Sequence, residues 1–285
     1  MPRQWLVVHA RSPSDELNAL LAEGLIACGG HAVEEAGDWQ TTWLAPAADP
    51  EAAVVELRQR LEALLDTPVE VRWELRDDED WDARWRAGLG PRRIGRRIIV
   101  TPAWTVPETT GDEIVIIIDP QMAFGTGEHA STRGVLHLLE DAVASDAVML
   151  DAGTGSAVLA IAAARLGAAR VIAVDLDADA ILNARENVTR NGCADRVHLD
   201  SAEIDAAWLA QFKAAFDVIT ANILSGVLHP LLPAFHDALR DGGSLLLGGL
   251  LESEARPMAA SAQAAGFDLI AEYGEEGWWS ARFVK

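Results

Sequence analysis

The fold of this chain is decided by one stretch in its second half, Met149-Leu150-Asp151-Ala152-Gly153-Thr154-Gly155-Ser156-Ala157. An apolar strand there runs into a glycine turn, and a helical pattern from Val158 to Arg165 follows it. Glycines at such a turn let the backbone bend sharply and approach a ligand where a side chain would collide. The stretch therefore predicts a strand, turn and helix of an α/β domain, with a ligand held at the turn.

From about residue 113 onward, apolar strands alternate with amphipathic helical patterns, as is typical of a doubly wound, mostly parallel sheet. The predicted strands are Ile114–Ile118, Val148–Leu150, Val171–Val174, Val197–Leu199, Asp217–Thr220, Leu245–Leu247, Phe267–Glu272 and Trp279–Val284. The last two are joined by a turn-like segment, Gly274 to Gly277. We interpret this terminal hairpin as the antiparallel edge of a class I methyltransferase sheet, whose Rossmann-like arrangement has seven strands, one fewer than the eight predicted from the pattern.

An acidic residue at the end of the next strand identifies the ligand at the turn as a nucleoside. Asp175 ends the strand Val171–Val174, 22 positions after Gly153, where its carboxylate can accept both ribose hydroxyls. The alternative is a glycine turn that only packs a helix on its sheet, which is rarer when an acid follows at this spacing.

Two nucleoside cofactors fit a glycine turn followed by an acid. A dinucleotide site requires a third small residue where Val158 stands, so the pattern fits NAD poorly. Asp151 stands immediately before the turn, in an Asp-x-Gly-x-Gly pattern with Gly153 and Gly155. A carboxylate at this place suits the cationic methionine end of S-adenosylmethionine better than a pyrophosphate. We therefore predict S-adenosylmethionine as the cofactor, and a nicotinamide oxidoreductase stays as a distant alternative.

Two further segments carry candidate active-site residues. The segment from Asp119 to Arg133 is a glycine-containing loop that ends in hydroxyl residues where a helical pattern starts. We expect Phe124 to line the active site and Thr132 to hydrogen-bond the carboxylate of the cofactor. His129 fits a general base and a loop-bracing residue equally well. Asn222 stands where the strand Asp217–Thr220 ends, and we predict that its amide meets the transferable methyl group, although an asparagine after a strand is often only a turn residue.

The first part of the chain has a different organisation. Residues 1–76 alternate in the order strand, helix, strand, strand, helix, strand, which predicts a small ferredoxin-like α+β domain. Residues 77–112 open with four acidic residues and then carry the chain's only basic cluster, which we interpret as a solvated linker. Residues 113–285 form the predicted cofactor-binding catalytic domain.

Composition narrows the class of partner. The formal net charge of −21 opposes direct binding of nucleic acid, and it favours a basic protein partner unless the acidity serves only solubility. No apolar stretch is long enough for a membrane span, and no signal peptide pattern is present. Cys28 and Cys193 lie far apart without a metal-binding or disulfide spacing. We expect a cytoplasmic protein without a bound metal, of unknown oligomeric state.

Together these motifs closely resemble the PrmA family, the ribosomal protein L-eleven methyltransferases, over essentially the whole chain. The resemblance is carried by Phe124-Gly125-Thr126-Gly127 with His129 and Thr132, by Asp151 to Ser156, by Ala221 to Leu224, by Gly248 to Leu251 and by Asp80 to Trp85. It implies that Thr132, Gly153, Asp175 and Asn222 contact S-adenosylmethionine. It also implies that the small domain recognises the substrate, and that the methyl groups go to lysine side chains and the N-terminal amine of a ribosomal protein.

The sequence departs from the family pattern in a few places. Ala157 replaces a glycine, Ala130-Ser131 replaces a proline and a threonine, and Glu128 and Ser225-Gly226-Val227 also differ. Two other functions stay open at this point. One is a lysine methyltransferase of another protein, such as an electron-transfer flavoprotein subunit, and the other is a non-catalytic cofactor-binding interaction protein. The separate small domain favours the ribosomal substrate.

Overall fold

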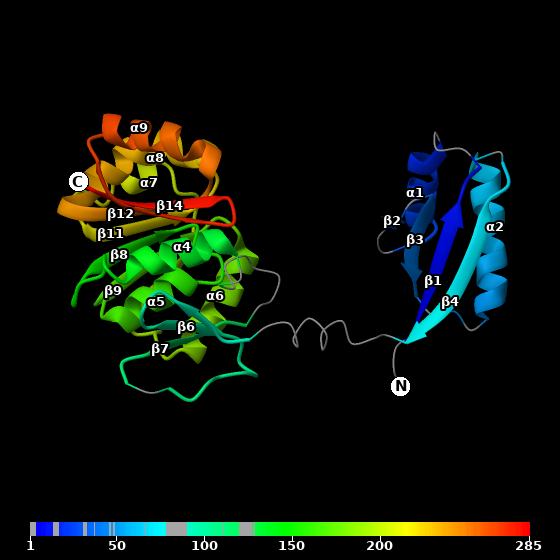
Figure 1. The fold of residues 1–285 in the computed structure, drawn as a ribbon, viewed down its shortest axis with the longest axis horizontal. Helices are drawn as coiled ribbons and strands as arrows, with labels where there is room; N and C mark the ends of the chain where they lie inside the picture. The colour runs from blue at the N-terminus through cyan, green and yellow to red at the C-terminus, as the bar shows by residue number, and fades with distance from the viewer. Residues whose placement is uncertain are drawn as a thin grey trace. The chain divides into compact units, whose positions relative to one another are not determined.

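The computed structural model divides the chain into two compact units, Met1–Gly88 and Leu89–Lys285 (Figure 1). It describes residues 4–13, 17–30, 33–36, 38–45, 47, 49–65, 67–77, 90–109, 111–119, 127 and 129–285. Within these ranges no helix combines the length and the apolar character that a membrane span requires.

The first unit is an antiparallel sheet with two helices on one face. Its elements are β1 (Gln4–Arg11), α1 (Asn18–Ala27), β2 (Val33–Ala36), β3 (Trp39–Leu44), α2 (Pro50–Leu65) and β4 (Glu70–Asp77), and the strands lie in the order β2-β3-β1-β4. Alternate residues of β1, Leu6, Val8 and Ala10, are buried against both helices. Helix α2 contributes Val54, Leu57, Leu61 and Leu65, at the spacing that puts them on one helical face. The elements follow one another in the order that the sequence predicts.

The second unit contains a seven-stranded sheet in the order β10-β9-β8-β11-β12-β14-β13. Its strands are β8 (Val148–Ala152), β9 (Arg170–Asp175), β10 (Val197–Ser201), β11 (Phe216–Asn222), β12 (Leu239–Leu251), β13 (Asp268–Glu275) and β14 (Trp278–Val284). Strand β14 pairs antiparallel with β12 and β13, whereas the pairs among β8 to β12 are parallel. The predicted doubly wound sheet with an antiparallel terminal hairpin is confirmed.

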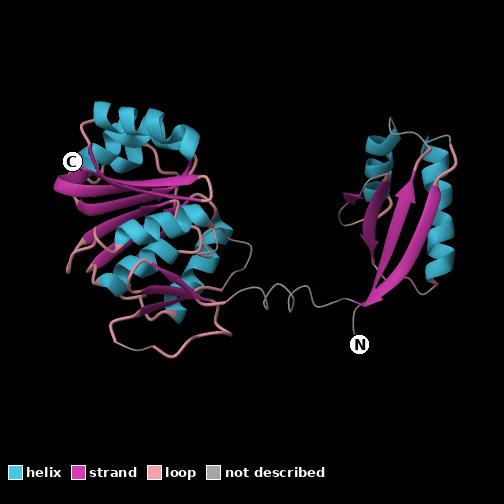
Figure 2. Cartoon of the chain, viewed as in Figure 1, coloured by secondary structure: helices cyan, strands magenta, loops and turns pink. Residues whose placement is uncertain are grey.

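Helices cover both faces of this sheet (Figure 2). They are α4 (Ala130–Leu139), α5 (Val158–Leu166), α6 (Ala178–Arg190), α7 (Ala206–Leu209), α8 (Ser225–Ala238) and α9 (Ala255–Ala264), with a short 3₁₀ turn η2 (Glu252–Glu254) before α9. Buried residues of α4, α5 and α6 form one hydrophobic cluster with the sheet. Buried residues of α8 and α9, with Leu209 of α7, form a second cluster on the other face. Each face therefore has its own core.

A separate three-stranded sheet differs from the sequence-based assignment. Strands β5 (Arg92–Ile94), β6 (Ile98–Thr101) and β7 (Ile114–Ile117) pair in that order, so β7 is not part of the large sheet. The sequence analysis placed residues 92–101 in the linker because of their arginines, whereas in the structure they belong to the second unit. The reason is that the apolar residues between the arginines, Ile94, Ile98 and Val100, are buried in the core against α4 and α5.

The turn between β5 and β6 is anchored by a buried carboxylate at the end of α4. The side chain of Glu140 accepts hydrogen bonds from the backbone N–H groups of Arg96 and Arg97, both at 2.7 Å. Gly95 lies in the left-handed region at φ +64°, and a Cβ there would lie 2.4 Å from Oε2 of Glu140. The basic segment is thus held by its backbone, while the guanidinium groups of Arg93 and Arg96 pair with Glu113 and Asp141.

Candidate active site

Most of the predicted site residues meet at one edge of the large sheet. Strand β8 lies between β9 and β11, and Asp151 is in register with Ala173 on one side and Thr220 on the other. The carboxyl ends of these parallel strands therefore carry Gly153, Asp175 and Asn222 to a common place. From β8 the chain first adds β9 and β10 on one side of the sheet, and β11 and β12 then lie on the other side of β8. The strand order therefore reverses between β8 and β11, and ligands of open α/β sheets bind at such a switch point.

The glycine turn after β8 requires glycine for two reasons. Gly153 and Gly155 have φ of +74° and +52°, which an L side chain disfavours. In addition, a Cβ on Gly153 would lie 2.4 Å from Cγ2 of Ile223, directly after β11. The N–H groups of Gly153 and Thr154 both donate to the carbonyl of Val174, at 2.9 and 3.0 Å, which ties the turn to the end of β9.

Asp175 supports the same turn with its side chain. Its Oδ2 accepts a hydrogen bond from the Gly155 N–H at 2.8 Å, and its Oδ1 accepts one from the Asp177 N–H at 3.0 Å. The side chain is partly exposed, and an ionised carboxylate has about four acceptor sites. Asp175 therefore has capacity left for the two hydroxyls of a ribose.

Asp151 lies at the end of β8, directly before the glycine turn. Its side chain is completely buried, and its two oxygens accept hydrogen bonds from the hydroxyls of Thr154 and Thr220, both at 2.6 Å. The carboxylate is thus directed into the domain, where it braces the glycine turn against β11, and its contact with the methionine end of a cofactor stays a prediction. Sequence reasoning missed both threonines because a hydroxyl inside a turn or strand gives no signal of its partner.

Burial raises the pKa of Asp151 from its ordinary 3.8 to about 6, although the hydrogen bonds from Thr154 and Thr220 act in the opposite direction. A raised pKa means that the folded protein keeps a proton that the unfolded chain has already released. Asp151 should therefore contribute about 3 kcal/mol to the free energy of unfolding below about pH 4, and this contribution should be lost as the pH rises through about 6. The measurement is urea unfolding of the wild type and of Asp151→Asn across this range. An identical pH dependence of the two proteins would contradict the assignment.

Asn222, at the end of β11, contacts Thr132 in the first turn of α4. The Asn222 amide donates from Nδ2 to Oγ1 of Thr132 at 3.3 Å. The other amide atom, Oδ1, is buried and has no hydrogen-bond partner among the described residues. An unpaired buried acceptor is unfavourable unless a ligand supplies the donor. Gly248 leaves room for this atom, since a Cβ there would lie 2.7 Å from it.

The start of α4 is fixed by His129 and by the terminal hairpin. Nδ1 of His129 lies 2.8 Å from the Ser131 hydroxyl, and the imidazole ring packs edge-on against Trp278, with the ring centroids 4.5 Å apart. Of the two roles considered for His129, this geometry supports the bracing role. Arg133, which the sequence did not single out, binds Glu275 through Nε at 3.0 and 3.1 Å. Phe124 lies outside the described residues, as does the segment Asp80 to Trp85.

The sheet order, the glycine turn after β8 and the acid at the end of β9 define the second unit as a class I methyltransferase domain. A family model described as ribosomal protein L11 methyltransferase (PrmA) matches residues 30–285. The chain belongs to this family, so the resemblance noted from the motifs is confirmed.

Individual members of this family are similar to the chain in sequence and in structure. The ribosomal protein L11 methyltransferase of Pelobacter propionicus is 44% identical over 178 residues, 61% of this chain and 56% of the relative. That of Symbiobacterium thermophilum is 37% identical over 253 residues, 85% of this chain and 79% of the relative. The match thus spans little more than half of the length of the first relative. Among solved structures, the ribosomal protein L11 methylase of Lactobacillus delbrueckii subsp. bulgaricus has a TM-score of 0.62 and 28% identity, with 69% of this chain and 98% of that chain covered.

Proposed function

We propose that this protein transfers methyl groups from S-adenosylmethionine to lysine side chains, to the N-terminal amine, or to both, on ribosomal protein L11. The observation that carries the proposal is the meeting of the glycine turn, the Asp175 carboxylate and the Asn222 amide at the switch point of a chain that belongs to this family. Action on a ribosomal protein implies a cytoplasmic enzyme, and the net charge of −21 favours contact with a basic protein over direct contact with nucleic acid.

The residues at the switch point fit S-adenosylmethionine. The absence of a side chain on Gly153 lets the turn lie against Ile223 at the end of β11, and Asp175 has acceptor sites for the ribose. The Asn222 Oδ1 atom is a buried acceptor with no hydrogen-bond partner among the described residues. Gly153, Gly155 and Asp175 would hold the nucleoside, with Thr132 at the methionine end, and the bound cofactor supplies an electrophilic methyl group on a sulfonium.

The chain's own contribution to the reaction is orientation and removal of water. An amine reacts only as the neutral form, whereas a free lysine has a pKa of about 10.4, so the bound amine must first lose a proton. Asn222 would accept a hydrogen bond from the amine at Oδ1, which directs the nitrogen lone pair. Phe124 would exclude water from the reacting amine.

The N-terminal unit is the proposed substrate-recognition domain. It has its own core between the sheet and the helices α1 and α2, and none of the cofactor residues lies in it. The experiment that tests the substrate uses labelled S-adenosylmethionine and purified, unmethylated L11, followed by mass spectrometry of the product. Label on a different protein of a methylation-free extract, with none on L11, would contradict the proposal and favour a lysine methyltransferase with another target.

Asn222→Ala tests the site itself. We expect kcat to fall about 100-fold, because a misplaced amine loses the in-line geometry, while the affinity for S-adenosylhomocysteine changes less than about threefold. Calorimetry and initial rates at saturating cofactor give the two quantities. Equal losses of affinity and turnover would make Asn222 mainly a cofactor-binding residue.

A further inference from the structure

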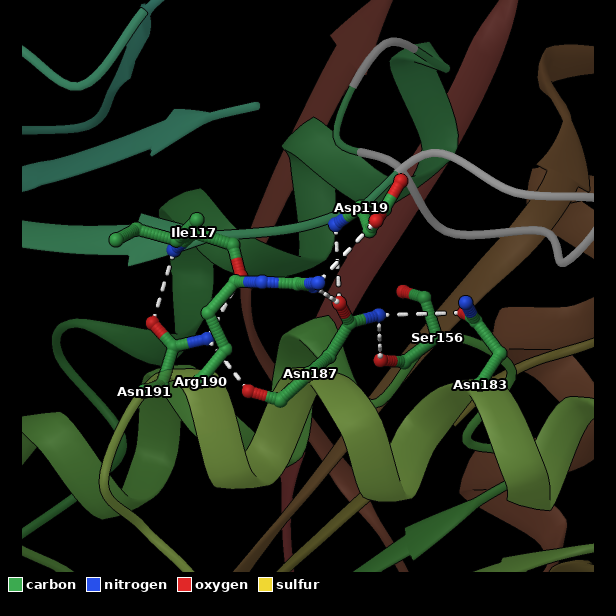
Figure 3. Close-up of polar contacts among 7 residues, drawn as sticks. All are labelled: Ile117, Asp119, Ser156, Asn183, Asn187, Arg190 and Asn191. Atoms are coloured by element: carbon green, nitrogen blue, oxygen red, sulfur yellow. Dashed lines mark hydrogen bonds and ion pairs between the residues drawn. The ribbon is translucent and has the colours of Figure 1, made fainter. Parts of the chain in front are cut away.

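Three asparagines are buried in the second unit, two in α6 and the third, Asn191, at its C-cap. Asn183, Asn187 and Asn191 are 5%, 0% and 7% exposed, and their spacing of four residues places them along one face of the helix. A helix face that packs on a core is ordinarily apolar, and a buried amide is unfavourable unless its atoms are hydrogen-bonded. These residues therefore serve a specific set of contacts, which Figure 3 shows.

Asn187 makes four hydrogen bonds through one side chain (Figure 3). Its Oδ1 accepts from the Asp119 N–H and from Nη1 of Arg190, both at 2.9 Å. Its Nδ2 donates to the carbonyl of Ser156 at 3.1 Å and to Oδ1 of Asn183 at 3.2 Å. The amide thus connects α6 with Asp119, just after β7, and with Ser156 at the end of the glycine turn.

The Ser156 carbonyl belongs to a peptide with an unfavourable backbone conformation. Ala157 follows it at φ +67°, the left-handed region, and this alanine is completely buried. An L residue adopts this region at an energetic cost, so the surrounding structure must hold it there. Two contacts do so: the Ala157 N–H donates to the Thr154 carbonyl at 2.9 Å, and Asn187 binds the carbonyl on the other side of the same peptide.

We propose that Asn187 is a positioning residue for the cofactor site. It holds the Ser156–Ala157 peptide so that the glycine turn keeps the conformation in which Gly155 contacts Asp175, and it joins this turn to the end of β7. The inference rests on the S-adenosylmethionine site of the proposed function. It adds a residue that touches neither cofactor nor substrate and acts through the backbone of the turn.

Asn191 provides a matched control one helical turn away. Its side chain is also buried and makes three hydrogen bonds, from the Ile117 N–H at 2.8 Å, to the Ile117 carbonyl at 2.7 Å and to the Asn187 carbonyl at 2.8 Å. It therefore supports β7 as Asn187 does, but the structure gives it no contact with the glycine turn. Loss of either side chain should lower stability, whereas only loss of Asn187 should disturb the turn.

The test compares Asn187→Ala with Asn191→Ala in the full chain, by calorimetric titration with S-adenosylhomocysteine and by Tm. We expect Asn187→Ala to weaken binding about tenfold, which corresponds to about 1.4 kcal/mol, with kcat at saturating cofactor reduced less than about threefold. Asn191→Ala should lower Tm by a similar amount and leave the affinity within about twofold. An affinity loss in Asn187→Ala no larger than in Asn191→Ala would overturn the inference.

Ala157→Gly tests the route through the turn. Glycine adopts the left-handed region without the Cβ penalty, so the double variant Asn187→Ala, Ala157→Gly should recover most of the lost affinity. Absence of recovery would overturn the proposed action through this peptide.

Should Asn187→Ala fail to fold, Asn183→Ala removes only the contact that orients the Asn187 amide, and about a threefold loss of affinity is expected. An unchanged affinity there would count against the inference. Wild-type protein that does not bind S-adenosylhomocysteine would overturn the proposed cofactor site and, with it, this inference. Wild-type binding with no specific loss in Asn187→Ala would overturn this inference alone.

Discussion

Asp175→Ala is expected to weaken the binding of S-adenosylhomocysteine by at least about 100-fold. The substitution removes the charged acceptor that we propose for two ribose hydroxyls, and each such hydrogen bond contributes about 1.5–3 kcal/mol. It also removes the acceptor of the Gly155 N–H, so the glycine turn loses a contact at 2.8 Å. Both effects act on the same ligand, and calorimetric titration measures their sum.

A neighbouring acid provides the control for this prediction. Asp177 lies two residues further on, where its side chain caps α6 by accepting a hydrogen bond from the Asp179 N–H at 2.9 Å. Asp177→Ala should cost about 1 kcal/mol of stability, as the loss of a helix cap does, with little change in affinity. If Asp175→Ala binds the ligand as well as Asp177→Ala does, the assignment of Asp175 to the ribose is wrong.

Deletion of the first unit, Met1–Gly88, is expected to leave cofactor affinity within about twofold while kcat/KM for folded L11 falls at least about 100-fold. The second unit has its own hydrophobic clusters on both faces of its sheet, and Gly153, Asp175 and Asn222 all lie in it. Cofactor binding therefore has no need of the first unit. Capture of a folded protein requires additional surface, which we assign to that unit.

A short lysine peptide serves as the control substrate, because it needs no recognition domain and should be methylated at the same low rate by both proteins.

An acidic enzyme also gains association rate on a basic substrate from complementary charge, and this gain should fall as salt rises past about 0.15 M, where the Debye length is about 8 Å. Rates for both proteins across a salt series test the two points together. Equal rates on folded L11 would show that the first unit is not the recognition domain.

The sequence by itself determined the features that depend on local pattern. The alternation of apolar strands and helices predicted the large sheet and its terminal hairpin, and the glycine turn with Asp175 predicted where the site lies. The structure confirms the sheet and the hairpin, because hydrophobic period and turn chemistry act over a few residues, whereas the place of the site stays a prediction. The second unit begins at Leu89, before the predicted end of the linker at residue 112, because the arginines of residues 92–97 gave this stretch the composition of a solvated linker.

Only the tertiary structure decided which groups meet. The Asp151 carboxylate is directed toward Thr220, 69 residues away, and the Asn187 amide reaches Ser156 and Asp119, 31 and 68 residues away. Such partners depend on the order of strands in the sheet and on which helix packs beside which turn, and no local period encodes either. For this reason the sequence predicted the glycine turn, whereas only the structure shows that a buried carboxylate and a buried amide are hydrogen-bonded to it.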